Sequence, residues 1–117
     1  MSKILVTDDS SFMRRVLVET LKKAGYDDIL EAKSGTEVLE IVKNENVDLI
    51  LLDVIMPNMN GIEVLKELNS KQKVIIVTAV GQEDIIDKAK SLGALGYITK
   101  PFELEQVLEE VKKALDL

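Results

Sequence analysis

Five short aliphatic runs alternate with amphipathic stretches along the 117-residue chain, and this alternation limits the folds that are open to it. Two of the runs, 49–52 and 74–77, are continuously aliphatic, which is typical of central parallel strands covered on both faces. Alternating strands and helices form a parallel sheet with right-handed crossovers. We therefore predict a doubly wound α/β fold with the strand order 2-1-3-4-5. The predicted strands are 3–7, 28–32, 49–52, 74–77 and 97–99.

The stretches between these strands have the period of helices, and several have recognisable ends. Ser10 or Ser11 is the expected N-cap of the first helix, and Gly25 stops it. The second helix opens with "SGTE", residues 34–37, which has the spacing of a capping box. The first helix is predicted over 12–24, the third after Gly61, the fourth over 83–92, and the fifth from about Glu103, with one apolar face formed by Leu104, Val107, Leu108, Val111 and Leu115.

Composition narrows the chemistry that such a fold can carry. The chain has no histidine and no cysteine, which excludes imidazole catalysis, thiolate metal sites and disulfides. The formal net charge is -6 and the basic residues form no long run, so we expect no direct binding of nucleic acid. No apolar run reaches the ~18 residues of a membrane span, so we expect no membrane insertion and a cytoplasmic location. The sequence shows no linker or repeat, and we predict one domain over residues 1–117.

Polar residues follow four of the five predicted strands. Asp8 and Asp9 come after the first strand, Asp53 after the third, Thr78 after the fourth and Lys100 after the fifth. In an open α/β sheet these positions all lie at the carboxyl edge of the strands, where ligands bind, and the acidic residues lie on either side of the switch point. The fold therefore predicts that the five side chains come together.

Three carboxylates at one edge repel one another unless a cation lies between them. Oxygen ligands without nitrogen or sulfur favour a hard cation, and a site with few protein ligands favours Mg²⁺. Lys100 is then placed to bind a phosphoryl group, and the Thr78 hydroxyl to donate to a phosphoryl oxygen. We therefore predict phosphoryl transfer with Asp53 as the nucleophile, which forms an aspartyl phosphate.

The segments "ILVTDDSSFMRR", "LILLDVIMPNMNG", "VTA" and "YITKPF" resemble, in order and spacing, the motifs of the receiver domain of two-component response regulators. The resemblance covers essentially the whole chain. It implies that Asp8 and Asp9 bind Mg²⁺, that Asp53 accepts phosphate from a partner's phosphohistidine, and that Lys100 contacts that phosphate. The bond between Lys100 and Pro101 is often cis in this family.

The resemblance implies further roles for three residues. The backbone carbonyl of Ile55 is an additional metal ligand in this family. Thr78 and Tyr97 form its switch pair, in which the threonine moves toward the phosphate and the tyrosine turns inward. Phosphorylation then changes the surface of the fourth helix, fifth strand and fifth helix, residues 83–115, which contacts a downstream protein.

The expected partners follow from the same resemblance. Because the chain has no histidine, the donor histidine belongs to another protein, a histidine kinase. "SSFMRR" and the lack of an output domain resemble stand-alone chemotaxis receivers, so we expect a monomer that acts in chemotaxis. A phosphorelay intermediate and a receiver excised from a larger regulator remain alternatives.

Two other classes of function are open to this fold. A flavodoxin-like cofactor binder needs hydroxyl- and glycine-rich phosphate loops, but "TDDSSF" offers two carboxylates after the first strand. A phosphatase that turns over through an aspartyl phosphate needs an acid two residues after its nucleophile, and this chain has Ile55 there. Ile55, and Val80 two residues after the switch threonine, are apolar where many receivers have polar residues. We therefore expect a longer-lived phosphoryl group than in fast chemotaxis receivers.

Overall fold

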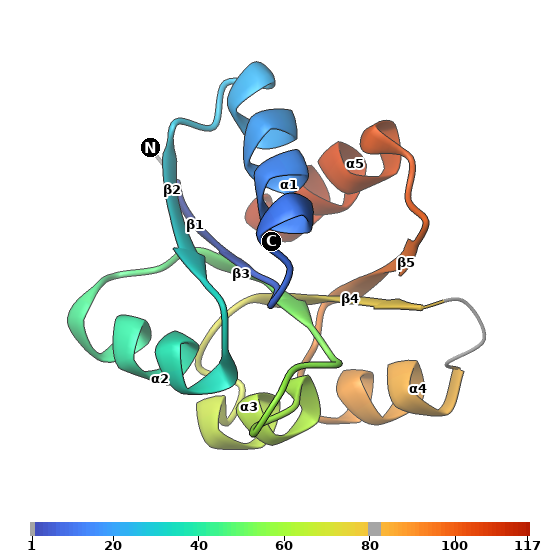
Figure 1. The fold of residues 1–117 in the computed structure, drawn as a ribbon. Helices are drawn as coiled ribbons and strands as arrows, with labels where there is room; N and C mark the ends of the chain where they lie inside the picture. Colours follow the sequence, from blue (N-terminus) through green and yellow to red (C-terminus); the bar gives the residue numbers. More distant parts are fainter. Residues whose placement is uncertain (1, 80–82) are drawn as a thin grey trace.

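A five-stranded parallel sheet runs through the middle of the computed structural model, which describes residues 2–79 and 83–117 (Figure 1). The strand order is β2-β1-β3-β4-β5, which confirms the predicted topology. All four neighbouring pairs of strands are parallel. The strands are β1 (Lys3–Thr7), β2 (Asp28–Ala32), β3 (Leu49–Asp53), β4 (Val74–Ala79) and β5 (Gly96–Lys100).

Helices cover both faces of the sheet, as a doubly wound fold requires. Helices α1 (Ser11–Lys23) and α5 (Leu104–Leu115) lie on one face, and α2 (Gly35–Asn44), α3 (Gly61–Leu68) and α4 (Glu83–Ser91) lie on the other (Figure 1). Each face has its own aliphatic core, because successive strand residues point to opposite sides of the sheet. In β3, for example, Leu51 packs in the core beneath α1 and α5, and Leu52 packs in the other core.

Three strands extend further toward their carboxyl ends than the aliphatic runs predicted. Asp53 is the last residue of β3, Thr78 lies inside β4, and Lys100 ends β5. The cause is the ladder between neighbours, in which Asp53 pairs with Val77 and Thr78 pairs with Thr99. The polar side chains therefore start from rigid strand positions and not from the loops that follow.

The N-caps differ in part from the prediction. Ser10 caps α1, and the Ser34 hydroxyl accepts a hydrogen bond from the Glu37 amide at 3.2 Å. The Glu37 carboxylate, however, accepts from the amide of Lys33 and not from that of Ser34, so α2 lacks the reciprocal half of a capping box. The complete box is found at α3, between Asn60 and Glu63, where asparagine takes the place of the expected serine or threonine.

The apolar face predicted for α5 is buried only in part. Val107 and Val111 are buried, whereas the side chain of Leu104 is 51% exposed. Leu104 is the first residue of the helix, one turn before Val107 and Leu108. An apolar residue on the same helix face as buried residues thus stays exposed here, at the first position of the helix.

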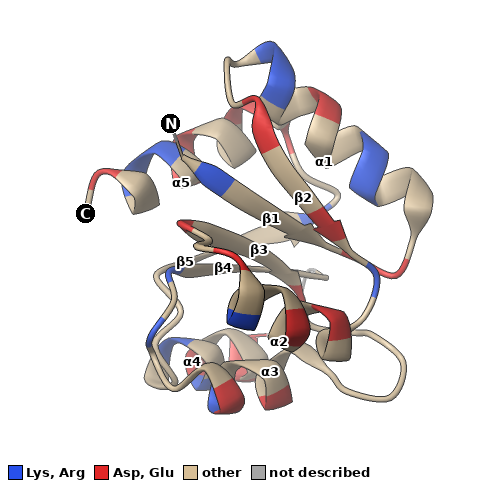
Figure 2. Ribbon diagram, turned by 90° about the vertical axis from the view of Figure 1, so that its left-hand side faces the viewer, with Lys and Arg blue, Asp and Glu red and all other residues tan. Residues whose placement is uncertain are grey.

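The surface carries both charges. Lysine and arginine alternate with aspartate and glutamate along the helices in the view of Figure 2. Among the described residues, no helix is long and apolar enough to cross a membrane.

The start of α3 packs directly on the end of β3. The Gly61 amide donates to the Val54 carbonyl at 2.8 Å, and a Cβ atom added at Gly61 would lie 2.8 Å from both the Asp53 carbonyl oxygen and the Val54 Cα. Because these are backbone atoms, no side-chain rotation relieves such a contact. Gly61 is needed for α3 to lie against the backbone of Asp53.

We predict that Gly61→Ala lowers the free energy of unfolding by about 1–3 kcal/mol, as overpacking against a fixed backbone does. Urea denaturation measures this change. Ser11→Ala is the matched control, because Ser11 is also the first residue of a helix but is exposed, and its effect should stay within about 0.5 kcal/mol. Equal effects of the two substitutions would show that Gly61 is under no steric constraint.

Candidate functional site

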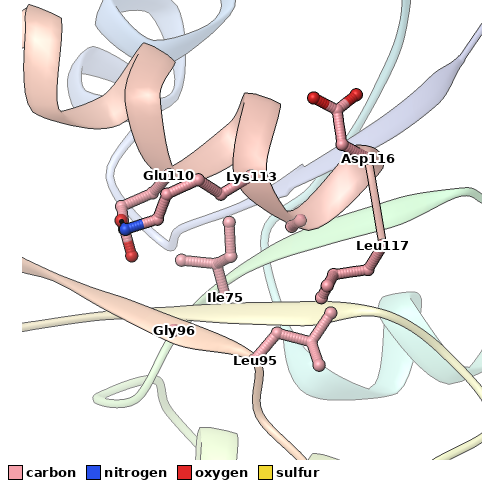
Figure 3. A pocket seen from close by; sticks show the side chains of 8 residues that line it. Ile75, Leu95, Gly96, Glu110, Lys113, Asp116 and Leu117 are labelled. Atoms are coloured by element: carbon pink, nitrogen blue, oxygen red, sulfur yellow. Dashed lines mark ion pairs between the residues drawn. The ribbon is translucent and has the colours of Figure 1, made fainter.

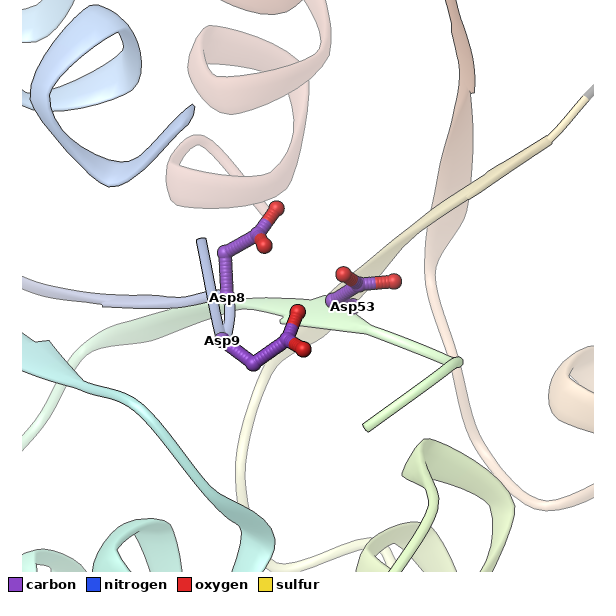
Figure 4. A group of neighbouring side chains, drawn as sticks. All are labelled: Asp8, Asp9 and Asp53. Atoms are coloured by element: carbon purple, nitrogen blue, oxygen red, sulfur yellow. The ribbon is translucent and has the colours of Figure 1, made fainter. Parts of the chain in front are cut away.

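Three carboxylates meet at the carboxyl edge of β1 and β3. Asp8 and Asp9 directly follow β1, and Asp53 ends the neighbouring strand β3. One carboxylate oxygen of each residue lies within 4.8 Å of the others, and the three side chains converge in Figure 4. The parallel pairing of the two central strands thus brings together residues that are about 45 positions apart in the sequence.

Lys100 joins two of these carboxylates. Its ammonium group donates to Asp8 Oδ2 at 3.0 Å and to Asp53 Oδ2 at 3.2 Å. Asp8 and Asp53 are 1% and 5% exposed, so these are ion pairs at a buried site. Burial lowers the pKa of Lys100, but its hydrogen bond to Asp8 and the charges of Asp53 and Asp8 outweigh burial and raise it. Lys100 therefore stays protonated and provides a fixed positive charge between the acids.

Two short backbone contacts orient the carboxylates. The Ser10 amide donates to Asp8 Oδ1 at 2.9 Å, and the Ile55 amide donates to Asp53 Oδ1 at 3.1 Å. Asp8 and Asp53 therefore each have one carboxylate oxygen bound to a backbone amide and the other bound to Lys100. The polypeptide just after each strand turns so that its own amide holds the carboxylate in place.

Asp53 is the group whose ionisation is most affected by this environment. Burial of its carboxyl group and the charge of Asp8 raise its pKa from 3.8 to about 6, although Lys100 and the Ile55 amide act in the opposite direction. Ionised Asp53 is thus under electrostatic stress at neutral pH. A cation or any bound group that neutralises the acids relieves this stress.

The donor set fits a hard divalent cation. It contains only carboxylate oxygens, and Asp9 is exposed, so the cluster opens toward solvent on one side. Mg²⁺ prefers such a site, because it binds a few carboxylates and keeps several of its waters. Ile55, whose carbonyl was predicted as another ligand, follows Asp53 by two residues, with its side chain 64% exposed.

Thr78 lies near the carboxyl end of β4, the strand next to β3, with its hydroxyl buried. It follows Val77, the residue of β4 that pairs with Asp53, and it is 2% exposed. Within residues 2–79 and 83–117, the hydroxyls of Thr7 and Thr78 are buried without a hydrogen-bond partner. A buried hydroxyl without a partner destabilises the fold, so Thr78 holds an unused donor near the carboxyl end of β4. Val80, the other residue in which we expected an influence on phosphoryl lifetime, lies outside the described residues.

Tyr97 is on β5, three residues before Lys100, and its side chain faces outward. It is 37% exposed, and the ammonium group of Lys90 on α4 lies 5.1 Å from the centre of its ring. This distance is typical of a cation–π contact. The structure thus links α4 and β5 through a pair that the sequence patterns did not indicate.

Sequence reasoning also missed a role for Arg14. Its guanidinium contacts the backbone carbonyl of Asp8 and the carboxylate of Glu31. The position of Arg14 one helical turn after the N-cap Ser10 is a usable signal, because helical side chains point back toward the N-terminus. The Lys100–Pro101 bond is cis.

A pocket of about 470 Å³ lies at the opposite edge of the sheet, between α5 and the amino ends of β4 and β5 (Figure 3). Its floor is apolar and includes Ile75 and Leu95. Two of its charged residues, Glu110 and Lys113, pair with each other at 2.9 Å. The pocket contains none of the clustered carboxylates, so its size does not make it the reactive site.

Comparison with known proteins agrees with this geometry. Residues 4–112 match the response regulator receiver domain, so the chain belongs to that family. It is 42% identical to sporulation initiation phosphotransferase F of Bacillus subtilis, over 98% of this chain and 94% of that protein. It is 36% identical to chemotaxis protein CheY of the same organism, over 97% of this chain and 98% of that protein.

Solved structures give the same result. The fold matches Vibrio cholerae chemotaxis protein CheY4 with a TM-score of 0.90 and 31% identity, over 98% of this chain and 99% of that chain. The chain is therefore a receiver domain of two-component signalling, a signalling module and not a conventional enzyme. The acidic cluster of Asp8, Asp9 and Asp53 is consistent with the Mg²⁺ site of a receiver domain.

The raised pKa of Asp53 predicts how stability depends on pH when chelator keeps divalent metal away. Between pH 3.8 and about 6 the unfolded chain ionises at Asp53 before the folded protein does, so stability falls as pH rises through this window. Over this interval the free energy of unfolding should fall by up to about 3 kcal/mol, at about 1.4 kcal/mol per pH unit. Asp53→Asn removes this titration and should therefore become more stable than wild type at pH 7 but not at pH 4.

Urea denaturation at pH 4 and pH 7 with EDTA measures this difference. Asp27→Asn, at an exposed position between α1 and β2, is the control and should show the same small effect at both pH values. Adding millimolar Mg²⁺ at pH 7 should stabilise wild type more than Asp53→Asn, by binding linkage. A stability gap between wild type and Asp53→Asn that is equal at the two pH values would contradict the pKa shift.

Proposed function

We propose that this protein is a phosphorylation-controlled switch in which Asp53 accepts a phosphoryl group from a histidine kinase in a Mg²⁺-dependent reaction. The observation that carries the proposal is the position of Lys100, whose ammonium group lies within hydrogen-bonding distance of both Asp8 and Asp53. A phosphoryl group on Asp53 brings more negative charge to this point, and a fixed cation is what its oxygens need.

The residues present account for the transfer step. An oxygen of Asp53 forms the new bond to phosphorus as the bond between phosphorus and the imidazole nitrogen of the donor breaks. The imidazole nitrogen keeps the bonding electron pair. Lys100 can then exchange its contact with Asp53 Oδ2 for a contact with a phosphoryl oxygen. Positioning and charge neutralisation supply most of the catalysis in such transfers.

Asp8 and Asp9 would hold the metal ion together with Asp53. The ion, when bound, neutralises phosphoryl charge that the carboxylates would otherwise repel. The Ile55 carbonyl belongs to this proposal as a further ligand. Its basis is the family resemblance together with the position of Ile55 two residues after Asp53.

Thr78 and Tyr97 would connect the phosphoryl group to the surface. The free Thr78 hydroxyl donates to a phosphoryl oxygen, and its movement leaves space behind it. Tyr97 then turns inward, which requires it to leave Lys90. Phosphorylation thereby shifts a pre-existing equilibrium and changes the surface of α4, β5 and α5, residues 83–115, where a downstream protein binds.

Two biological settings are supported by different relatives. We propose chemotaxis because several of the similar proteins carry that name, including CheY of Thermotoga maritima at 37% identity. A phosphorelay is the second candidate, because the sporulation phosphotransferase of Bacillus subtilis is 42% identical over nearly the whole chain. Transfer of the phosphoryl group from Asp53 to a histidine phosphotransfer protein is the test of the relay. In either setting the partners are proteins, and we propose that they meet a monomeric receiver in the cytoplasm.

We predict that acetyl phosphate and Mg²⁺ add one phosphoryl mass to wild type and none to Asp53→Asn, because Asp53 is the nucleophile. Intact-protein mass spectrometry measures the gain, and chelation of the metal should abolish it. A gain in Asp53→Asn would place the acceptor elsewhere. No gain in wild type, under conditions that phosphorylate a control receiver, would overturn the proposal. A time course after donor removal tests the long phosphoryl lifetime expected from Ile55 and Val80.

The two unpartnered threonines provide a matched test of the switch. Thr7→Val and Thr78→Val each remove a buried hydroxyl without a partner, so each should raise the free energy of unfolding by about 1 kcal/mol. Only Thr78→Val should lower the phosphorylated fraction at a fixed acetyl phosphate concentration, by about tenfold, because it removes a hydrogen bond to a charged group. Equal phosphorylation of the two variants would remove Thr78 from the mechanism.

A further inference from the structure

Every polar atom of Asp8 has a partner in the structure. Its amide donates to the Ala32 carbonyl at 3.2 Å, its Oδ1 accepts from the Ser10 amide, and its Oδ2 accepts from Lys100. The remaining atom, the backbone carbonyl oxygen, accepts from the guanidinium of Arg14 at 2.7 Å. Asp8 is thus held by four contacts, and two of them come from the side chains of Lys100 and Arg14.

The carbonyl that Arg14 contacts belongs to the peptide bond between Asp8 and Asp9. Rotation of this peptide plane would change the direction of the Asp9 side chain relative to that of Asp8. Asp9 is exposed, and no neighbouring strand restrains it as β2 and β3 restrain Thr7. The hydrogen bond from Arg14 is therefore a restraint on the relative orientation of the two adjacent carboxylates.

Arg14 is itself held in place. Its Nε donates to Glu31 Oε1 on β2 at 3.1 Å while Nη1 donates to Asp8, so one planar group makes two contacts in two directions. The Arg14 side chain is 16% exposed, which limits solvent screening, whereas the Glu31 side chain is 51% exposed. The contact with Asp8 is the more protected of the two, and Glu31 orients the guanidinium for it.

We propose that Arg14 is a positioning residue that fixes the peptide between Asp8 and Asp9 and so pre-orients both carboxylates for Mg²⁺, with Glu31 as its support. This inference rests on the proposed function, because it assumes that the acid pair binds the metal. Groups that orient metal ligands typically change metal affinity by about 10- to 100-fold when they are removed. A purely structural role as a link between α1 and β2 would change stability and leave Mg²⁺ affinity unaltered.

The test is the Mg²⁺ dissociation constant of the full chain, measured by calorimetric titration with MgCl₂. Arg14→Met should weaken binding about 10- to 100-fold. Arg14→Lys should weaken binding less than Arg14→Met does, because an ammonium group keeps the positive charge. It should still bind more weakly than wild type, because an ammonium group cannot reproduce the planar pair of contacts that the guanidinium makes. Glu31→Gln should show the smallest loss of the three. Arg15→Met is the matched control, since Arg15 is the exposed neighbour on the same helix, and it should bind Mg²⁺ as wild type does.

A second readout separates positioning from loss of structure. In the Arg14 variants, phosphorylation by acetyl phosphate should be slow at low Mg²⁺ and should recover toward the wild-type rate at saturating Mg²⁺. Wild-type Mg²⁺ affinity in both Arg14→Met and Arg14→Lys would overturn the proposal. A loss of Mg²⁺ affinity in Arg15→Met as large as that in Arg14→Met would also overturn the proposal.

The failure of this inference and that of the proposed function are distinguishable. If wild type takes no phosphoryl group but Arg14→Met still loses Mg²⁺ affinity, the positioning role stands and the receiver function fails. If wild type is phosphorylated and the Arg14 variants bind Mg²⁺ normally, the receiver function stands and the positioning role fails.

Discussion

The repulsion between carboxylates at the ends of β1 and β3 is the constraint on which the rest of the structure depends. Flexible loops would relieve such repulsion by moving apart. Here Asp53 is part of a paired strand and Asp8 follows one directly, with aliphatic cores on both faces of the sheet, so the acids cannot separate without disturbing the core. Burial of Asp53 in this rigid setting, together with the nearby charge of Asp8, raises its pKa. Lys100 offsets part of the repulsion, and the remainder favours any cation that binds there.

The same contacts connect the acids to the surface of the molecule. Lys100 ends β5, and Tyr97 lies three residues earlier on that strand beneath Lys90 of α4. A group on Asp53 that takes over the contact with Lys100 therefore acts on the strand that carries Tyr97. Thr78 is on β4 and pairs with Thr99 of β5, so both routes from the acids lead to β5. The proposed response of the α4, β5 and α5 surface would follow from this link, because β5 contributes Lys100 to the site.

Much of the fold was predictable because it follows from local patterns that the tertiary structure does not override. Continuous aliphatic runs marked β3 and β4 as central strands, and the order of strands then placed Asp53, Thr78 and Lys100 at one edge. The sequence could not predict contacts that depend on where a helix lies on the sheet. Leu104 continues an apolar face but is exposed, and Gly61 is constrained by the backbone of Asp53. In the sequence, Arg14 resembles any other helical arginine, because its contact with Glu31 depends on α1 lying beside β2.

The chemistry of the acids is common to both settings that the relatives suggest, so specificity has to come from the surface. A chemotaxis receiver and a relay intermediate both need a nucleophile, a metal and a fixed cation, and Asp53, Asp8, Asp9 and Lys100 are suited to either. They differ in what happens to the phosphoryl group, which either stays and changes the surface of residues 83–115 or leaves for a second histidine. A relay needs a second histidine protein to reach Asp53, whereas an output switch needs Tyr97 to change position. The exposed residues around the acids therefore bear on the relay, and the Lys90–Tyr97 contact bears on the switch.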